Sequence, residues 1–341
     1  MEVWVWIKFA ACAAIIIIAG TKLTRYSDTI ADKTGLGKTF VGILFLAVAT
    51  SIPEMATEIS SVRFVIPPNP DLALGDAFGS NLFNLLILAL LDVLYTRGSI
   101  WTHVSKGQTL LAVLSMATVG LATISALAGK LDFDIGVGWL SIFSLFLIAF
   151  YMINLTATYK YEKKLQGRAD IEADVPYEGI TLRRAYVGYG ITAAIIIGGG
   201  IWLALIGDEI ASKTGWESSF VGSIFLGITT SLPELVVSIT AIRIGSVDLA
   251  IGDILGSNMF NVSVILFVAD IFYAGGSVFS RVESPLTFIA IGLLTMIMTA
   301  AVLFGLILKA RTKTLKWISW NSIALVILYI TGTYFIFRIP A

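Results

Sequence analysis

The chain alternates long apolar stretches with short polar segments. Most of the apolar stretches contain about twenty residues, the length that an α-helix needs to cross the hydrocarbon core of a bilayer. This pattern predicts ten transmembrane helices, near residues 3–22, 38–63, 72–95, 108–128, 135–158, 185–206, 217–242, 249–273, 284–308 and 317–337. The one long polar segment, residues 159–184, separates two sets of five helices. We therefore expect an all-α membrane protein.

The composition agrees with this interpretation. Hydrophobic residues make up 57% of the 341 residues and charged residues only 13%, so a bilayer must solvate much of the surface. The first apolar stretch has no basic region before it and no small-residue cleavage site, which favours a retained helix over a signal peptide. A net charge of zero gives no indication of a nucleic-acid partner. A single cysteine, Cys12, excludes a disulfide framework and is expected to pack in the interior.

The positive charges predict an orientation. Most of the 23 lysines and arginines fall on the side of the membrane that contains residues 159–184. Cytoplasmic loops are enriched in these residues, so we expect this linker to be cytoplasmic and both termini to lie outside. The expected location is the plasma membrane, where the protein spans the lipid bilayer several times and functions as a monomer.

The two halves carry matching segments. "DTIADKTGLGKTFVGILFLAVATSIPEMATEIS" aligns with "DEIASKTGWESSFVGSIFLGITTSLPELVVSIT", and "LALGDAFGSNLFN" aligns with "LAIGDILGSNMFN". The first pair of segments begins with Asp28 and Asp208, which we expect at solvated helix ends. This self-similarity indicates an internal duplication, with five-helix repeats at 1–158 and 185–341 and the matched regions at about 38–95 and 217–273. The copies lie on the second and seventh helices, so an odd number of crossings inverts one repeat relative to the other.

Each copy places a proline and a glutamate inside a membrane helix, as "ATSIPE" and "TTSLPE". Proline lacks an N–H and displaces the carbonyl four residues earlier, here that of Ala49 or Thr229. The freed carbonyls must face a polar cavity or pair within the protein, because lipid cannot satisfy them. The hydroxyls next to them belong to Thr50, Ser51, Thr230 and Ser231. Hard oxygen atoms of this kind suit sodium and calcium.

The carboxylates of Glu54 and Glu234 indicate the charge of the ligand. Burying each in a membrane costs about 2.5–3.5 kcal/mol, and the inverted symmetry brings both to the same depth. A divalent cation, several sodium ions or two protons would relieve their repulsion. The "GSNLFN" and "GSNMFN" motifs add neutral oxygens on one helix face, from Ser80, Asn84, Ser257 and Asn261. One kinked helix with a glutamate is explained equally well by helix packing, whereas two matched copies favour a cation site.

These motifs resemble the α-repeats of the cation/calcium exchanger superfamily, in particular its sodium/calcium exchanger branch. The branch's "G-T-S-x-P-E" and "G-S-N-x-x-N" patterns match the four motifs quoted above, and the resemblance covers essentially the whole chain. It implies alternating-access antiport, in which entering sodium drives calcium out and no cofactor takes part. The metal ligands that it implies are Glu54, Glu234, Asn84, Asn261, Thr50, Thr230, Ser51, Ser231, Ser80, Ser257, Ala47 and Gly227. Ala47 and Gly227 would contribute backbone carbonyls, and the hydroxyls of Ser80 and Ser257 would flank the centre as sodium ligands.

Three departures within the family bear on mechanism. The proton/calcium branch typically has asparagine before its glutamate, so Pro53 and Pro233 favour sodium coupling. Some prokaryotic members have aspartate at the position of Asn261. The asparagine of this chain gives the site less negative charge than such members have. The linker is too short for the large cytosolic calcium-sensing domain of animal exchangers. The family further implies that the first and sixth helices slide over the remaining bundle.

Three further acids lie in or beside the repeated motifs. Asp76 and Asp253 match across the copies, and we expect them to cap helices, although guiding cations into the site is the alternative. Glu58 follows Glu54 by one helical turn, but its counterpart is Ser238. We therefore expect Glu58 to act in an access path or in packing, not as a central ligand.

Other functional classes remain open. A proton/calcium antiporter, or one for another divalent cation, would use the same carboxylates, and a cation channel could share the oxygen cage. An enzyme is not expected, because no Ser/His pair, aspartate-protease pattern or HExxH motif is present. The single histidine, His103, falls in a short inner loop at the surface and cannot serve a proton relay in the membrane.

Overall fold

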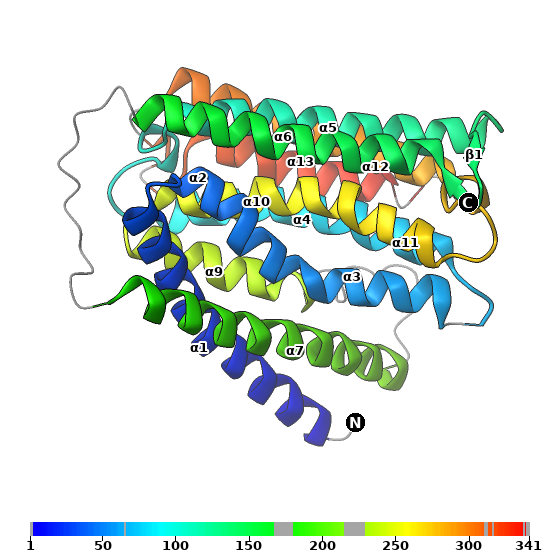
Figure 1. Ribbon diagram of the computed structural model, residues 1–341, viewed down its shortest axis with the longest axis horizontal. Coiled ribbons are helices and arrows are strands. Elements are labelled where there is room, and N and C mark those ends of the chain that lie inside the picture. The colour runs from blue at the N-terminus through cyan, green and yellow to red at the C-terminus, as the bar shows by residue number, and fades with distance from the viewer. Residues whose placement is uncertain are drawn as a thin grey trace.

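The computed structural model describes residues 3–64, 66–166, 180–214, 229–309, 313–315, 317–336 and 338. Figure 1 shows long helices packed side by side, most of them along the long axis of the molecule. The helices are α1 (Val3–Thr34), α2 (Lys38–Val41), α3 (Ala47–Arg63), α4 (Pro70–Leu94), α5 (Lys106–Lys130), α6 (Ile142–Gln166), α7 (Leu182–Thr214), α9 (Leu232–Arg243), α10 (Val247–Phe260), α11 (Leu266–Phe272), α12 (Pro285–Leu308) and α13 (Trp320–Ile336). Short π-helical turns at Gly42–Leu46 and Asn261–Ile265 join α2 to α3 and α10 to α11, and 3-10 turns form at Ile100–Thr102 and Phe279–Arg281.

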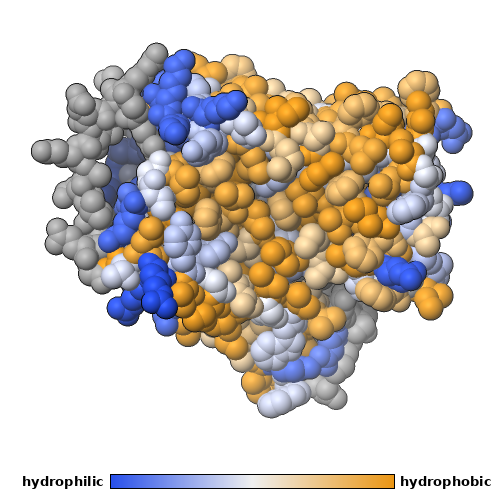
Figure 2. All heavy atoms as spheres, viewed as in Figure 1, coloured by the Kyte–Doolittle hydropathy of each residue, from blue (hydrophilic) through white to orange (hydrophobic). Residues whose placement is uncertain are grey.

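The described helices agree closely with the apolar pattern. The described residues contain eight helical spans that are long and apolar enough to cross a membrane, and some of these spans combine consecutive helices, as in Lys38–Arg63. Helix α13 is a shorter apolar helix. The predicted helix at 217–242 lies partly outside the described residues, and α9 covers its end. Figure 2 shows apolar side chains over the middle of the face seen in Figure 1, with hydrophilic residues mostly toward the two ends of the long axis. This distribution fits a protein surrounded by lipid.

The predicted start of the helix at 135–158 is wrong. Strands β1 (Gly136–Val137) and β2 (Leu140–Ser141) pair there as a small antiparallel ribbon, and α6 begins only after it. Gly138 has a φ of 70° at the tip of this ribbon, a backbone conformation that glycine adopts without strain. Gly136 and Gly138 both lie in this ribbon, where the predicted helix would have begun. A two-stranded ribbon therefore accompanies an otherwise helical fold.

Helices α1 and α7 pack against each other along much of their length, at the lower edge of the view in Figure 1. Glycines permit the close approach: a Cβ on Gly188 would lie only 2.4 Å from the ring of Tyr26. Cys12 is buried between them, as predicted, and its thiol donates to the carbonyl of Gly199 at 3.1 Å.

Asp28 does not lie at a solvated helix end. Its side chain is buried, and its Oδ1 lies 2.9 Å from Nζ of Lys38 and accepts a hydrogen bond from the hydroxyl of Ser246. These contacts connect α1 to the start of α2 and to the segment before α10. The expectation was wrong because the chain folds back over this end of α1. The side chain of Asp208 lies outside the described residues.

Two buried aspartates bind the backbone in the same way. Asp92 and Asp270 are both fully buried, and each accepts two backbone N–H groups and one serine hydroxyl. The donors to Asp92 are Ile100 N at 3.1 Å, Ser319 N at 2.8 Å and Ser322 Oγ at 2.9 Å, and those to Asp270 are Val278 N at 2.8 Å, Ser141 N at 2.7 Å and Ser144 Oγ at 2.7 Å. Each aspartate therefore connects a helix end to the start of α13 or α6.

Candidate cation site

The two proline motifs lie in helices of different shape. Thr229 and Thr230 are helical, Ser231 forms a turn and helix α9 begins at Leu232, so the helix is interrupted inside the second motif. Helix α3 instead continues through Pro53 without interruption. The first copy therefore lacks the helix break that its proline predicts.

Three local features accommodate Pro53 inside α3. A π-helical turn at Gly42–Leu46 precedes the helix and loosens its hydrogen-bond ladder. The Thr50 hydroxyl donates to the carbonyls of Leu46 at 3.0 Å and of Ala47 at 3.3 Å. The proline ring packs against Gly200 of α7, where a Cβ would lie only 2.3 Å from the Cγ atom of the ring. The carbonyl of Ala49 still receives no helical hydrogen bond from residue 53, because proline has no backbone N–H.

The two central glutamates lie together in the interior. Glu54 is 1% exposed and Glu234 is 0% exposed. The Ser51 hydroxyl donates to Oε1 of Glu234 at 3.2 Å, and the charges of the two glutamates act on each other. Among the described residues, neither oxygen of Glu54 has a hydrogen-bond partner, nor has Oε2 of Glu234. The desolvation of two buried carboxylates with unpartnered oxygens is offset either by a bound cation or by protonation.

Neutral oxygens with no hydrogen-bond partner accompany these carboxylates. They are Oγ of Ser80, Ser231 and Ser257 and Oδ1 of Asn84 and Asn261, all buried. Buried polar atoms are normally hydrogen-bonded, so unpartnered oxygens at matching positions of the repeated motifs are candidate ligands. Oxygen atoms alone form this set, as sodium and calcium require.

The structure describes three of the four remaining predicted ligands. Thr50 and Thr230 are fully buried. Ala47 is buried at the start of α3, and Gly227 lies outside the described residues. Among the residues that the structure describes, no group of three or more His, Cys, Asp or Glu is arranged to hold a metal ion. A cation between the glutamates would therefore depend on neutral oxygens for its other ligands.

Two asparagines that the site prediction omitted join α4 to α10. Asn81 donates through Nδ2 to the carbonyl of Asn258 at 3.0 Å, and Asn258 donates back to the carbonyl of Asn81 at 3.2 Å. Asn84 Nδ2 donates to Oδ1 of Asn258 at 3.0 Å, and Asn261 Nδ2 donates to Oδ1 of Asn81 at 3.3 Å. These bonds hold the amides of Asn84 and Asn261 so that their oxygens stay unpartnered. The repeated "GSN" marked both residues, but the pairing is visible only in three dimensions.

Asp76 and Asp253 do not cap their helices, and the preferred sequence interpretation was wrong. Asn69 caps α4 by accepting a bond of 3.0 Å from the N–H of Leu72, and α10 begins at Val247. Asp253 is fully buried inside α10 and accepts a 2.9 Å hydrogen bond from the hydroxyl of Ser238. The charge of Asp76 acts on both Glu54 and Glu234. Both aspartates therefore belong to the interior around the central glutamates.

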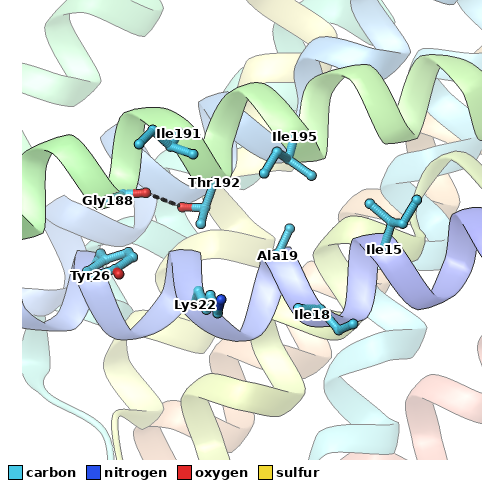
Figure 3. Close-up of a pocket in the computed structure, with 9 residues that line it drawn as sticks. All are labelled: Ile15, Ile18, Ala19, Lys22, Tyr26, Gly188, Ile191, Thr192 and Ile195. Atoms are coloured by element: carbon cyan, nitrogen blue, oxygen red, sulfur yellow. Dashed lines mark hydrogen bonds between the residues drawn. The ribbon is translucent and has the colours of Figure 1, made fainter.

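A groove between α1 and α7 is a poor alternative site for cations. Figure 3 shows that it is lined mainly by aliphatic side chains from the two helices, with Thr192 bonded back to the carbonyl of Gly188. Its volume is about 300 Å³, and Lys22 is the only charged residue that lines it. A cation in this groove would meet no carboxylate.

Known proteins resemble the chain over most of its length. The family model for the sodium/calcium exchanger protein matches residues 4–152 and 184–338. The sodium/calcium exchanger MaX1 of Methanosarcina acetivorans is 25% identical, over 95% of this chain and 96% of its own length. The inner membrane protein YrbG of Escherichia coli is 26% identical, over 74% of this chain and 75% of its own length. The putative antiporter CaxA of Alkalimonas amylolytica is 26% identical, over 77% of this chain and 82% of its own length.

The fold is also that of a solved exchanger. A structure of the sodium-calcium exchanger NCX_Mj superimposes with a TM-score of 0.72 and 19% identity, covering 100% of both chains. At this identity the superposition establishes the arrangement of the helices, and the family model establishes kinship. The protein is therefore a multi-pass membrane protein, and the chain belongs to the sodium/calcium exchanger protein family.

Proposed function

We propose that this protein is a secondary active antiporter that exchanges sodium for calcium by alternating access. The observation that carries the proposal is the meeting of Glu54 and Glu234, from distant parts of the chain, in the interior with unpartnered oxygens. Kinship with exchangers, including a relative named a sodium/calcium exchanger, supports the choice of ions. A proton/calcium antiporter is the alternative, because it would use the same carboxylates.

The proposed ligands form one central site for the transported ions. Glu54 and Glu234 supply the negative charge, and hydroxyl, amide and carbonyl oxygens complete the coordination. The neutral ligands are Thr50, Ser51, Thr230, Ser231, Ser80, Ser257, Asn84, Asn261, Ala47 and Gly227. Calcium takes six to eight oxygen ligands in flexible geometry, which a mixed set of this kind provides.

The carboxylates make exchange obligatory. An empty site keeps two unpaired negative charges, and carrying these past an apolar barrier is costly. One calcium ion or a set of sodium ions neutralises the site, so only the loaded site changes the side to which it opens. Pro53 and Pro233 stand where the proton/calcium branch of the superfamily typically has asparagine, and this resemblance favours sodium over protons as the coupling ion. Helices α1 and α7 are the elements expected to slide.

We also propose that the chain contains ten transmembrane helices in two inverted repeats, 1–158 and 185–341, joined by the linker 159–184. The matching bonds of Asp92 and Asp270 support this architecture, because each accepts three donors from corresponding elements of the two halves. The distribution of lysine and arginine supports outer termini, a cytoplasmic linker and the plasma membrane. The protein is expected to act as a monomer.

The decisive experiment is calcium-45 uptake into sodium-loaded proteoliposomes at equal internal and external pH. We expect the wild-type protein to take up calcium only when sodium is inside, and Glu54→Gln and Glu234→Gln to abolish uptake. Glu283→Gln is the matched control, because Glu283 is an exposed glutamate. Normal uptake by both central variants would refute the site. Uptake driven by a pH gradient without sodium would favour the proton/calcium antiporter, and flux without any counter-ion would indicate a channel.

A further inference from the structure

The two halves differ one helical turn beyond the central glutamates. In the second half this position is Ser238, whose hydroxyl donates a hydrogen bond of 2.9 Å to Asp253. In the first half the matching residues are Glu58 and Asp76. A neutral donor and an acid on one side thus correspond to two acids on the other.

Helix packing brings Glu58 and Asp76 to the same level. Helices α3 and α4 run in opposite directions, and Val62 of α3 lies in one buried cluster with Ala73 of α4. Glu58 lies one turn before Val62, and Asp76 lies about one turn after Ala73, so both occupy the next layer toward Glu54. The charge of Asp76 acts on Glu58.

Among the residues that the structure describes, no group compensates Glu58. Its side chain is 0% exposed, and neither of its carboxylate oxygens has a hydrogen-bond partner. The ion pairs found in the described part of the chain are Lys8–Glu209, Lys38–Asp28 and Lys38–Asp32, none of which involves Glu58. A buried ionised carboxylate without partners is strongly unfavourable, so it either takes up a proton or lies next to a cation.

One ion in the central site cannot balance these charges. A single calcium ion between Glu54 and Glu234 supplies no counter-charge to three further buried acids, Glu58, Asp76 and Asp253. Asp253 accepts a hydrogen bond from the hydroxyl of Ser238, whereas both carboxylate oxygens of Glu58 lack a hydrogen-bond partner among the described residues. A divalent ion shared by Glu58 and Asp76 would balance the charges of these two acids. Carboxylates in pairs are typical ligands of calcium, which completes its shell with carbonyl oxygens or water.

We propose that Glu58 and Asp76 bind a second divalent cation, calcium in the first instance, adjacent to the central site on the side where α3 ends and α4 begins. The proposal rests on the cation-exchange function proposed above. The matching positions of the other half, Ser238 and Asp253, hold one acid and not a pair. Ions that arrive from one side of the membrane therefore meet an acid pair before the central glutamates, and ions that arrive from the other side do not.

The test is the number of calcium ions bound per chain, measured by equilibrium dialysis with calcium-45 on the purified full-length protein in sodium-free detergent solution. We expect two ions for the wild type and one for Glu58→Ser, which copies the serine–aspartate pair of the other half. Glu54→Gln should also lose one ion. Ser238→Ala is the matched control and should still bind two, because it leaves both acid pairs intact.

Each result separates this proposal from the proposed function. One ion bound by both the wild type and Glu58→Ser, with none bound by Glu54→Gln, would overturn the second site and leave the central site standing. No binding by the wild type would count against both. If Glu58→Ser does not yield folded protein by gel filtration, Glu58→Gln provides the same comparison with nearly unchanged volume. Infrared spectroscopy adds an independent criterion: a protonated-carboxyl band that Glu58→Gln removes from the calcium-bound protein would show a proton in place of the second cation and overturn the proposal.

Discussion

The hydroxyl of Ser51 donates a hydrogen bond of 3.2 Å to Oε1 of Glu234, although the two residues lie 183 positions apart. Ser51 precedes Pro53 in the first motif, and Glu234 is the acid of the second. Each copy of the motif therefore completes the surroundings of the other. The central site therefore forms only when the two halves of the chain pack together.

Ser51→Ala should weaken calcium binding by about tenfold, because a hydrogen bond to a charged group contributes about 1.5–3 kcal/mol and part of this is regained when an ion binds. The measurement is the dissociation constant of calcium in sodium-free detergent solution. Ser60→Ala provides the control, because Ser60 lies on the same helix and is exposed. An unchanged dissociation constant for Ser51→Ala would show that this hydroxyl does not support the site.

Asn81→Ala should destabilise the protein by about 2–4 kcal/mol, since it removes two buried hydrogen bonds and leaves their partners on Asn258 and Asn261 unpaired. Thermal unfolding in detergent, followed by the fluorescence of the 8 tryptophans, measures this effect. Thr156→Ala, at an exposed position of α6, should leave the unfolding temperature unchanged. Equal unfolding temperatures for the two variants would contradict a structural role for the asparagine network.

Gly200→Ala should destabilise the protein by about 1–3 kcal/mol and reduce exchange, because the added methyl group would overlap the ring of Pro53 and push α7 from α3. Gly198→Ala is a matched control on the same helix, where nothing lies within 4 Å of the added atom. Alanine favours helices over glycine by up to about 1 kcal/mol, so this control should unfold at the same or a higher temperature. Thermal unfolding and calcium uptake together test the pair, and equal behaviour of the two variants would refute the steric argument.

Asp92→Asn and Asp270→Asn should each destabilise the protein by about 1–3 kcal/mol. Both carboxylate oxygens of each aspartate accept hydrogen bonds, whereas an asparagine amide has one acceptor oxygen and would turn its NH2 group toward the other donors. The effects should add in the double variant, since the two aspartates share no partner among their hydrogen bonds. Asp132→Asn is the control, at an exposed position with a φ of 53° that asparagine tolerates well. Thermal unfolding of all four variants is the measurement, and a double variant no less stable than either single one would contradict independent roles.

Much of the helical organisation was predictable because the bilayer imposes it. A membrane helix must be apolar over a fixed length, so its boundaries are visible in the sequence without knowledge of its neighbours. The predicted stretch 38–63 corresponds to the described run Lys38–Arg63, and 249–273 to Val247–Phe272. The ribbon at 136–141 escaped this rule because it lies at the end of an apolar stretch, where glycines and the N–H acceptor Asp270 determine the backbone.

The burial of the candidate ligands was likewise foreseen from two repeated motifs, whereas their partners were not. Asp28 was expected in solvent and is paired with Lys38, and Asp253 was expected to cap a helix and instead accepts from Ser238. In each case the deciding contact comes from a residue on another element. A local pattern specifies which side chains share a helix face but not which face of another helix will meet them.

The sequence by itself determined the apolar helices, the duplication, and the two glutamates that predict a cation site, since these depend on composition, length and self-similarity. Only the tertiary structure decided that Ser51 contacts Glu234, that four asparagines join α4 to α10, and that Glu58 lies unpartnered beside Asp76. The physical reason is that such contacts depend on how each helix rotates and crosses its neighbours, which the packing of the whole bundle fixes.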